Sequence, residues 1–529
     1  MTLATATLPT DPDELRAFAA ALQSELYSKS LMIERLRAQL AKLKRRNFGQ
    51  SSEKLNAEIQ QLELVLGDLE ETEAQDEARS EASAAPNRDK AAKDAARGSG
   101  RGNREPLPEH LPREIVNHAG ACVCPACGSQ NLRKVNDETR DVLEYVPSHF
   151  KVVVHVRPVM SCRDCETVTQ PKMPSLPIER GRPGPALLAH VIVSKYCDHN
   201  PLNRQSDIYA REGVEIDRST MADWVGRMAW LAGPIAEGIG RYARAGPAVH
   251  ADDTPIPVQD PGAGKTRKGR LWVVVRDESA WGSGQPLAAY YQYSPDRKGI
   301  HAQTLLAPCR GYLHADAYGG FEKLYDPDPI DGQVKLIEVA CWAHARREIY
   351  DEHVRTKSPL PRQALERMGE IFAIEREING QSAETRLAVR QARSRPLLAD
   401  LKSFYDKTLE RISQRSDLTK AIRYSTKRWE ALTRFTEDGR LEMTNNAAER
   451  AIRPLTLGRR NWTFLGSDAG GDRAAVFFTI IQTCRLNSVN PEAYLTDLFA
   501  RLADHPAHRI DELLPWNWAP PAAIASAAA

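Results

Sequence analysis

Three acidic residues are placed where they could bind hard metal ions. Asp252 and Asp316 each lie at the end of a short apolar segment with strand character. Glu449 lies between residues 444 and 462, a segment that also carries Trp462 and four arginines: Arg450, Arg453, Arg459 and Arg460. If that segment is helical, Glu449 and Arg453 share one face, and a surface ion pair is the simplest interpretation of Glu449 on its own. The two upstream acids favour a shared site instead, because carboxylates brought together bind divalent cations.

Four cysteines in two C-x-x-C pairs form the clearest metal-binding pattern in the chain. The pairs begin at Cys124 and Cys162 and end at Cys127 and Cys165. A strand-rich interval separates them, so the two knuckles can close a tetrahedral zinc site of the zinc-ribbon type. Four thiolates leave no open position for water, which predicts one structural Zn²⁺ rather than a catalytic one. Cys122 lies outside the spacing and is excluded from the ligand set.

Length and composition indicate a multidomain protein. The 529 residues exceed what one hydrophobic core organises and suggest roughly three or four domains. Lys and Arg (72) nearly balance Asp and Glu (70), so any surface for nucleic acid must come from local clustering of charge. Because we find no signal-peptide pattern and no run of about 20 apolar residues, we expect a soluble cytoplasmic protein. The remaining cysteines expected to be ordinary buried thiols are Cys197, Cys309, Cys341 and Cys484.

Residues 1–71 show the apolar periodicity of a coiled coil. Apolar side chains alternate in steps of four and three from Leu15 to Leu43, and the pattern resumes after a break and runs to Leu69. Such a stripe requires a partner helix, supplied either by a hairpin or by a second copy of the chain. We therefore predict an oligomerisation segment, followed over 72–105 by a flexible linker whose small and charged residues could not fill a core.

A four-cysteine zinc-binding domain is predicted over 106–180, and a helical region over 181–245. In the helical region one helix ends at Gly213, and a second helix, capped by Ser219, follows after a short turn. This pattern predicts a helix-turn-helix arrangement, which could dock on DNA or serve only for packing. The candidate DNA contacts in this region are Arg204 and Arg218.

Beyond Gly246 the apolar pattern changes to a period of two, which predicts a sheet. Three hairpin-like strands, a helical piece and two further strands alternating with helices are typical of the ribonuclease H-like α/β fold. In that fold an acid on the first strand meets one on the fourth, and an acid on a later helix can complete a site for two cations. Asp252, Asp316 and Glu449 fit these three places. The predicted boundaries are 246–350 and 441–515 for the two parts of this catalytic domain, 351–440 for an all-helical insertion, and 516–529 for a disordered tail.

Four segments resemble the catalytic signatures of the insertion sequence 66 family of DDE transposases. They are His250-Ala-Asp252-Asp-Thr-Pro, Ala315-Asp316-Ala-Tyr-Gly-Gly-Phe, Cys341-Trp-Ala-His344-Ala-Arg-Arg and Asn445-Asn-Ala-Ala-Glu449-Arg-Ala-Ile-Arg-Pro. The resemblance extends over nearly the whole chain, because the cysteine pairs, Lys44-Arg-Arg-Asn-Phe48-Gly-Gln-Ser-Ser-Glu53-Lys-Leu and Pro201-Leu-Asn-Arg-Gln also match. The chain departs from the family pattern at Asp253, where glutamate is common, and at Asn47, where an apolar residue is frequent.

The resemblance implies a DNA transposase that cleaves at the terminal inverted repeats of its element and joins the ends to target DNA. It implies that Asp252, Asp316 and Glu449 bind two Mg²⁺ ions, since phosphodiester displacement requires stabilisation of both the attacking and the leaving oxygen. The implied partners are double-stranded DNA, further copies of the chain and accessory proteins of the same element, in the bacterial cytoplasm and on the nucleoid. The residues expected to hold phosphates or stack on a base are Arg450, Arg453, Arg459, Arg460 and Trp462.

Two alternatives to a transposase stay open from the sequence. One is a ribonuclease H-like nuclease that cuts without joining, and the other is an inactive, zinc-dependent DNA-binding regulator. Several side chains near the predicted site are given other roles. Asp253 is expected to point to the opposite face of its strand, and Glu442 is the less favoured candidate for the third acid. Cys341 and His344 are assigned to packing rather than to a metal site.

Overall fold

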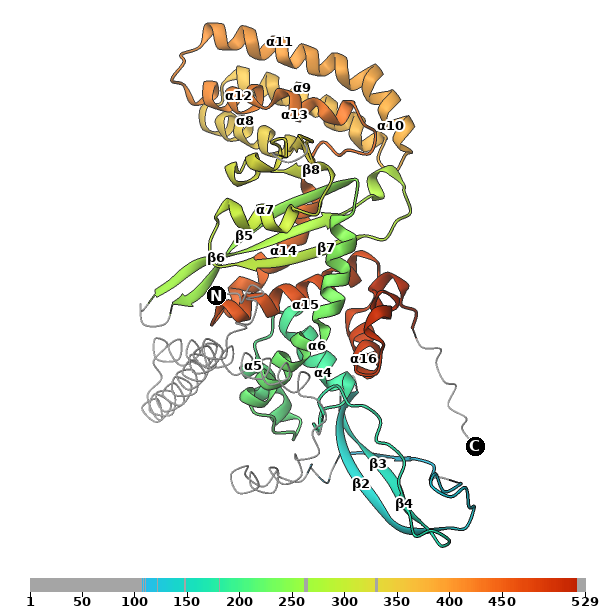
Figure 1. Ribbon diagram of the computed structural model, residues 1–529. Helices are drawn as coiled ribbons and strands as arrows, with labels where there is room; N and C mark the ends of the chain where they lie inside the picture. The colour runs from blue at the N-terminus through green and yellow to red at the C-terminus, as the bar shows by residue number, and fades with distance from the viewer. Residues whose placement is uncertain are drawn as a thin grey trace, which may run out of the picture.

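The computed structural model describes residues 107–520 except 108, 110, 121, 147–148, 180, 261–264 and 329–331. The predicted coiled coil over 1–71 and the linker over 72–105 lie outside the described residues. The described chain is mixed α+β, as predicted, with a sheet at one end, a second sheet in the middle and a group of helices at the other end (Figure 1). Within this part of the chain, none of the helices combines the length and apolar character needed to cross a membrane.

The first sheet carries the cysteine pairs at one end of a long hairpin. Its strands are β1 (Arg113–Asn117), β2 (Leu132–Val146), β3 (His149–Cys162) and β4 (Val168–Thr169). β2 and β3 are antiparallel, β1 runs parallel to β3, and β4 adds to the other end of β3. The first residue of β2, Leu132, pairs with Cys162. The hairpin therefore brings the second cysteine pair to the loop that holds the first.

The central sheet has the strand order β7-β6-β5-β8-β9. Its strands are β5 (Ala248–Asp260), β6 (Lys265–Arg276), β7 (Ala288–Ser294), β8 (Gly311–Ala315) and β9 (Leu336–Ala340). β5, β6 and β7 are antiparallel neighbours, whereas β8 and β9 continue the sheet parallel to β5. Parallel strands need a crossover connection, and α7 (Gly299–Leu306) lies in the one between β7 and β8. β5 is thus the middle strand of the sheet, with the antiparallel strand β6 on one side and the parallel strand β8 on the other.

Three helices occupy the region predicted to be a helix-turn-helix: α4 (Pro185–Tyr196), α5 (Leu202–Arg211) and α6 (Arg218–Arg244). α5 ends at Arg211, and Gly213 takes a positive φ of 78° in the turn that follows it. The prediction of Ser219 as the N-cap is wrong, because α6 begins one residue earlier with Asp217 at the cap. α6 is 27 residues long and packs against β6 and β7. Much of this second helix therefore belongs to the core of the central domain.

The closing helix α15 (Asp468–Leu486) covers the free edge of β7. Thr479 accepts the backbone N–H of Tyr291 at 2.9 Å, and Thr483 accepts that of Ala289 at 3.2 Å. Thr479 and Thr483 are four apart, so both point from one face of the helix to the strand. An uncovered edge strand would expose unpaired backbone groups to a second sheet. Here Thr479 and Thr483 accept hydrogen bonds from two of the backbone N–H groups on this edge.

The predicted helical insertion forms a second hydrophobic core above β9. Its helices are α8 (Trp342–Thr356), α9 (Pro359–Glu377), α10 (Ala383–Val389), α11 (Arg395–Arg411), α12 (Asp417–Lys427) and α13 (Trp429–Thr433). Trp342 is fully buried there and donates its indole N–H to the Leu432 carbonyl at 2.6 Å. Arg390, in the π-helical turn between α10 and α11, is also fully buried. It donates to the carbonyls of Phe435 and Leu441, and so holds the loop that returns the chain to the central sheet.

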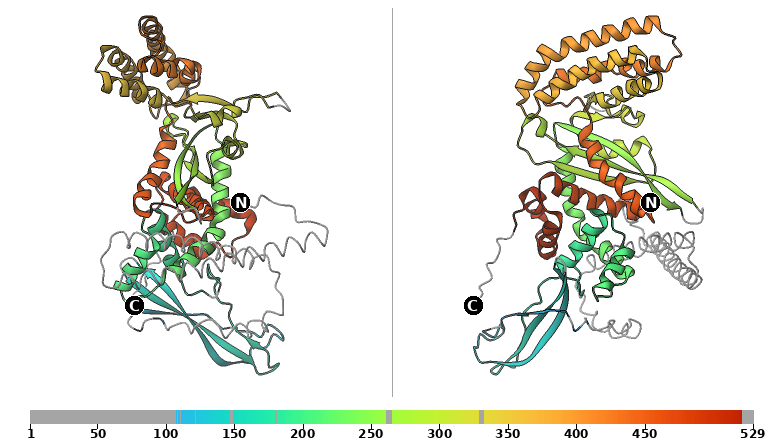
Figure 2. Two further views of the ribbon diagram at one scale, coloured as in Figure 1. Left: turned by 90° about the vertical axis from the view of Figure 1, so that its left-hand side faces the viewer. Right: turned by 180° about the vertical axis from the view of Figure 1, so that it is seen from behind.

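Two more helices complete the central domain: α14 (Asn446–Trp462) and α16 (Pro491–Arg501). α14 lies across one face of the central sheet and contacts β5 and β6 (Figure 2). The predicted tail over 516–529 begins too early. Trp516 and Trp518 pack against the core, and the Trp518 indole donates to Asp497 at 3.0 Å. Only residues 521–529 of that tail lie outside the described chain.

Candidate active site

β5 and β8 place Asp252 and Asp316 on the same side of the sheet. The two strands are parallel neighbours, and His250 pairs directly with His314. The two imidazole rings stack at a centroid distance of 4.2 Å. Side chains two residues apart on a strand point to the same face, so Asp252 and Asp316 each follow their histidine on that face. Asp316 comes directly after the last residue of β8, and its side chain is partly exposed.

Hydrogen bonds of the Asn445 side chain join the start of α14 to the first residues of β5. Its side-chain amide donates to the Ala251 carbonyl at 2.9 Å, and its Oδ1 lies 3.2 Å from Nδ1 of His250. Asn445 is fully buried, which makes these bonds costly to lose. α14 begins at the next residue, and Glu449 lies in its first turn. The bond between Asn445 and β5 therefore sets Glu449 beside Asp252.

The loop before α14 is also held by β8 and by the start of α8. The backbone N–H of Asn445 donates to Sγ of Cys341 at 3.2 Å, and that of Trp342 donates to the Met443 carbonyl at 3.0 Å. Nε2 of His314 lies 3.0 Å from both backbone polar groups of Glu442. His250, Cys341 and Asn445 lie within the four motifs and His314 directly precedes one of them, but the sequence assigned the histidines and Asn445 no role. The signal that could have identified their positioning role is that they lie in or beside the same sequence segments as the acids.

The surroundings of Asp252 disfavour its negative charge. Burial raises the pKa of Asp252 to about 7; the backbone N–H of Asp253, 2.7 Å from its Oδ1, opposes this, and Asp316, Asp253 and Glu449 add to it. Both predicted partners are thus close enough to act on Asp252. A divalent cation would offset this repulsion, and its binding would release the proton that Asp252 holds near neutral pH. The donor set of three carboxylates suits a hard cation such as Mg²⁺.

The three acids are more widely spaced than the ligands of a single ion. Two groups of described residues bring three or more potential ligand atoms within 4.8 Å of one another: the four cysteines, and Cys341 with His344 and Glu449. Asp252, Asp316 and Glu449 do not form such a group. In a site for two cations the ions lie about 3.5–4 Å apart, so each outer acid needs to reach only one of them.

The side chain of Glu449 does not pair with Arg453. No such ion pair occurs between these two described residues; instead Oε1 of Glu449 lies 3.8 Å from Nδ1 of His344. Neither of these two buried atoms has a hydrogen-bond partner in the described chain. The simplest sequence interpretation of Glu449, a surface ion pair on its own helix, is therefore wrong. His344, in the first turn of α8, therefore lies beside Glu449 and does not serve only to pack the core.

The neighbouring acids are occupied by other groups. Asp253 has a fully buried carboxylate that accepts from Arg270 at 2.9 Å and from Arg297 at 2.7 Å. Glu442 lies 3.6 Å from Nε2 of the buried His250. Arg297 also lies 3.8 Å from Asp316. The carboxylate of Asp253 is thus paired with two arginines, and that of Glu442 faces a histidine.

The predicted DNA-contacting side chains differ in how available they are. Arg450 pairs with Asp277 at 3.1 Å, and Arg459 donates to the Pro255 carbonyl, so both have partners inside the protein. Trp462 packs against the hydrophobic core. The side chain of Arg460 lies outside the description. Arg204 and Arg453 are exposed, and Arg218 is half-buried at the start of α6.

The four cysteines converge at the end of the first sheet. Sγ of Cys124 lies 3.2 Å from that of Cys165, and Sγ of Cys127 lies 3.8 Å from that of Cys162. Cys122 is exposed and is not part of the group. Four converging sulfurs without disulfides suit a structural zinc ion.

The two knuckles share one backbone design. In each, the residue after the second cysteine donates its N–H to the carbonyl of the first, at 2.9 Å for Gly128 and 2.9 Å for Glu166. Both residues take a positive φ, 76° for Gly128 and 57° for Glu166. Glycine adopts this conformation freely, whereas glutamate is strained there. The fold thus imposes the same turn on both cysteine pairs.

Family models match most of the described chain. A model for "Transposase IS66 family" matches residues 180–473, which include all three acids. Models for "zinc-finger binding domain of transposase IS66", "IS66 C-terminal element" and "Transposase C of IS166 homeodomain" match 121–166, 479–516 and 35–116.

Curated relatives cover the chain from end to end but carry no assigned activity. The uncharacterized protein y4hP of Sinorhizobium fredii is 40% identical over 91% of this chain and 88% of its own length. The uncharacterized protein y4qI of the same organism is 33% identical over 99% of this chain and 100% of its own. The chain and these relatives therefore share the same set of domains.

Proposed function

The chain belongs to the IS66 family of transposases, and on that premise we propose that it cleaves the ends of its element and joins them to target DNA. The central domain is then the ribonuclease H-like catalytic domain, and Asp252, Asp316 and Glu449 hold two Mg²⁺ ions. The observation that carries the proposal is the mutual placement of these acids. β5 and β8 set two of them on one face, and the bonds of Asn445 to β5 bring the third.

The chain's own residues hold the acids in place for this chemistry. The backbone N–H of Tyr318 donates to Oδ1 of Asp316 at 3.0 Å and fixes the rotamer of that carboxylate. Asp316 and Glu449 both act on the charge of Asp252, so all three carboxylates would share in holding the ions. When bound, the ions activate the attacking oxygen and stabilise the leaving 3′-oxygen of the scissile phosphodiester. Asn445 and His250 position Glu449 and are not expected to touch DNA.

Other parts of the chain fit the same role. The cysteine site would hold one structural Zn²⁺, and the exposed Arg204 and Arg453 are proposed contacts to the phosphates of duplex DNA. Oligomerisation through residues 1–71, accessory proteins of the same element and association with the nucleoid belong to this proposal too.

Strand transfer separates this function from cleavage alone. We expect the purified chain with Mg²⁺ to join a duplex of the element's end, pre-cut to a free 3′-hydroxyl, to a supercoiled plasmid. A nuclease that cuts without joining would nick the plasmid and leave the end duplex free. A regulator without catalytic activity would shift the mobility of the end duplex and change neither DNA.

A further inference from the structure

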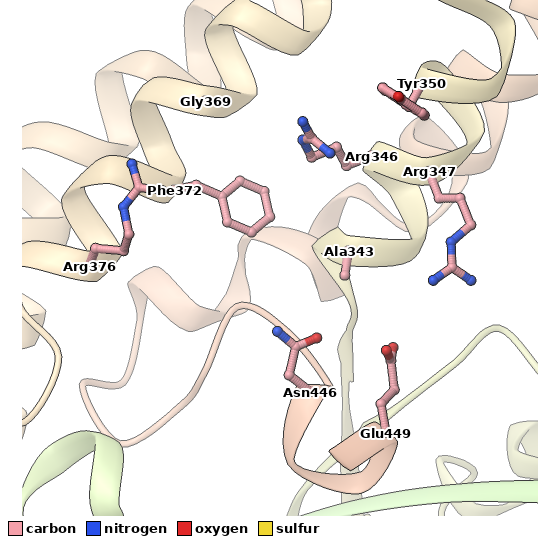
Figure 3. Close-up of a pocket in the computed structure, with 9 residues that line it drawn as sticks. All are labelled: Ala343, Arg346, Arg347, Tyr350, Gly369, Phe372, Arg376, Asn446 and Glu449. Atoms are coloured by element: carbon pink, nitrogen blue, oxygen red, sulfur yellow. The ribbon is translucent and has the colours of Figure 1, made fainter. Parts of the chain in front are cut away.

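A cavity of about 540 Å³ opens beside Glu449, between α8, α9 and α14. Asn446 and Glu449 lie on the α14 side, and side chains of the two insertion helices face them across the cavity (Figure 3). The residues that line it are Ala343, Arg346, Arg347, Tyr350, Gly369, Phe372, Arg376, Asn446 and Glu449. None of the residues from α8 and α9 has been given a function above. The cavity connects the helical insertion to the catalytic acids.

Three arginines of the cavity have no acidic partner. Arg346, Arg347 and Arg376 are exposed, and no ion pair to any of them occurs in the part of the chain that the structure describes. The acids on both sides of Arg376 in sequence are engaged elsewhere. Glu375 accepts from Arg390 at 2.7 Å, and Glu377 accepts from Arg393 at 2.6 Å. Positive charge is thus left free on this wall of the cavity.

The contrast with the outer surface of the insertion makes this arrangement informative. Other arginines of α9 pair with acids, Arg362 with Glu366 at 2.9 Å and Arg367 with Asp400 at 2.8 Å. Unpaired arginines within the same helices are therefore concentrated on the wall that faces Glu449. A phosphate group is the ligand that guanidinium groups bind best by charge and geometry.

An aromatic ring and a glycine complete the wall. Phe372 is half-buried, and its ring faces the cavity between Arg376 and Arg346 (Figure 3). Gly369 lies one turn before Phe372 on α9, and a Cβ added to it would meet no atom within 4 Å. Glycine is unfavourable inside a helix relative to alanine, and nothing nearby requires it. Its effect is to leave open space at this part of the cavity wall.

We propose that this cavity binds an unpaired nucleotide of the DNA strand next to the scissile phosphate. The base would stack on Phe372, and the neighbouring phosphates would lie against Arg346, Arg347 and Arg376. Stacking on an aromatic side chain stabilises a base and offsets much of the cost of unpairing it. This inference rests on the proposed function, because it takes the nucleotide to adjoin the site of Glu449.

Photochemical cross-linking tests the cavity without requiring cleavage. The probe is a duplex of the element's end with 5-iododeoxyuridine at the first position beyond the cut, bound with Ca²⁺ in place of Mg²⁺. We expect irradiation to attach it to Phe372 or Tyr350 in the full chain, identified by mass spectrometry. A mispair at that position should raise the cross-link yield several-fold, because the unpairing cost is then already met.

Substitutions at Gly369 supply a matched pair for this test. Gly369→Leu extends a large side chain into the cavity and should lower the cross-link yield at least fivefold, whereas Gly369→Ala should leave it unchanged. Phe372→Leu keeps most of the packing volume and should also lower the yield.

A second pair of variants tests the charge of the cavity. Arg411 is an exposed arginine at the end of α11, so Arg411→Ala is the control for Arg376→Ala. Arg376→Ala should reduce the slope of the logarithm of the DNA-binding constant against the logarithm of the salt concentration by about 0.7–0.9.

Equal cross-link yields in Gly369→Leu and Gly369→Ala would overturn the proposal, as would equal yields from paired and mispaired probes. Attachment only to residues outside the cavity would do the same. Failure of the proposed function looks different. In that case the wild-type chain with Mg²⁺ would neither cleave nor join the end duplex, while the cross-link to the cavity could still form and respond to Gly369→Leu.

Discussion

Replacing Glu449 by glutamine should lower the rate of Mg²⁺-dependent end cleavage by about a thousandfold or more, with little effect on folding. The substitution keeps the size of the side chain but removes the charge that we propose completes a two-cation site. Loss of one metal ligand costs several kcal/mol of transition-state stabilisation, and each 1.4 kcal/mol is about tenfold in rate. Cleavage of a labelled end duplex in single-turnover conditions measures the effect.

Two further substitutions make the role of Glu449 specific. Glu437→Gln, at an exposed acid of the preceding loop, should retain the wild-type rate. Glu442→Gln should retain most of it, because the Glu442 carboxylate faces His250 at 3.6 Å. DNA affinity with Ca²⁺ and the melting temperature should stay near wild type for Glu449→Gln. If the Glu449→Gln variant were active and the Glu442→Gln variant inactive, the third acid of the site would be Glu442 and not Glu449.

Replacing Arg390 by methionine should lower the free energy of unfolding of the helical insertion by about 3–5 kcal/mol. The Arg390 side chain is fully buried and paired with Glu375 at 2.7 Å, while it also donates to two carbonyls of the return loop. Its loss removes the partner of a half-buried carboxylate and of the buried Phe435 carbonyl, while the Leu441 carbonyl keeps only its bond from Arg386 at 2.9 Å. Urea unfolding followed by the fluorescence of Trp342 and Trp429, both in the insertion core, reports on this domain.

Arg393 provides the control three residues further along the chain. It pairs with Glu377 at 2.6 Å, but both side chains are half exposed, at 50% and 54%. Exposed ion pairs contribute about 0–1 kcal/mol, so Arg393→Met should change the unfolding free energy by less than 1 kcal/mol. Similar losses for Arg390→Met and Arg393→Met would show that the buried network does not hold the return loop.

The convergence of the cysteine pairs could be predicted from the sequence because their spacing carries the signal: the two C-x-x-C pairs enclose a hairpin. The proposed acids were identified in the same way from strand patterns, although Asp252 lies inside β5 and only Asp316 follows the end of its strand. The positioning of Glu449 could not be predicted in the same way. It depends on the bonds of Asn445 to His250 and Ala251, which join segments about 195 residues apart.

Arginine roles were the least predictable feature. The charged segment around Glu449 suggested a cluster of DNA contacts, yet Arg450 pairs with Asp277 and Arg459 with a backbone carbonyl. Conversely, Arg346 and Arg347 end the quoted Cys341 segment but were assigned no role, and Arg376 gave no sequence signal, because an arginine-rich amphipathic helix is normal on a protein surface. Which arginines are free depends on the tertiary partners of nearby acids, such as Glu375 and Glu377.

A crystal structure with Mn²⁺ and a pre-cut end duplex tests the central claim most directly. Anomalous scattering should place two Mn²⁺ ions about 3.5–4 Å apart, with Asp252 bound to both, Asp316 to one and Glu449 to the other. The 3′-hydroxyl of the duplex should lie at one of them. A single ion held by Cys341, His344 and Glu449, with Asp252 and Asp316 free of metal, would contradict the account.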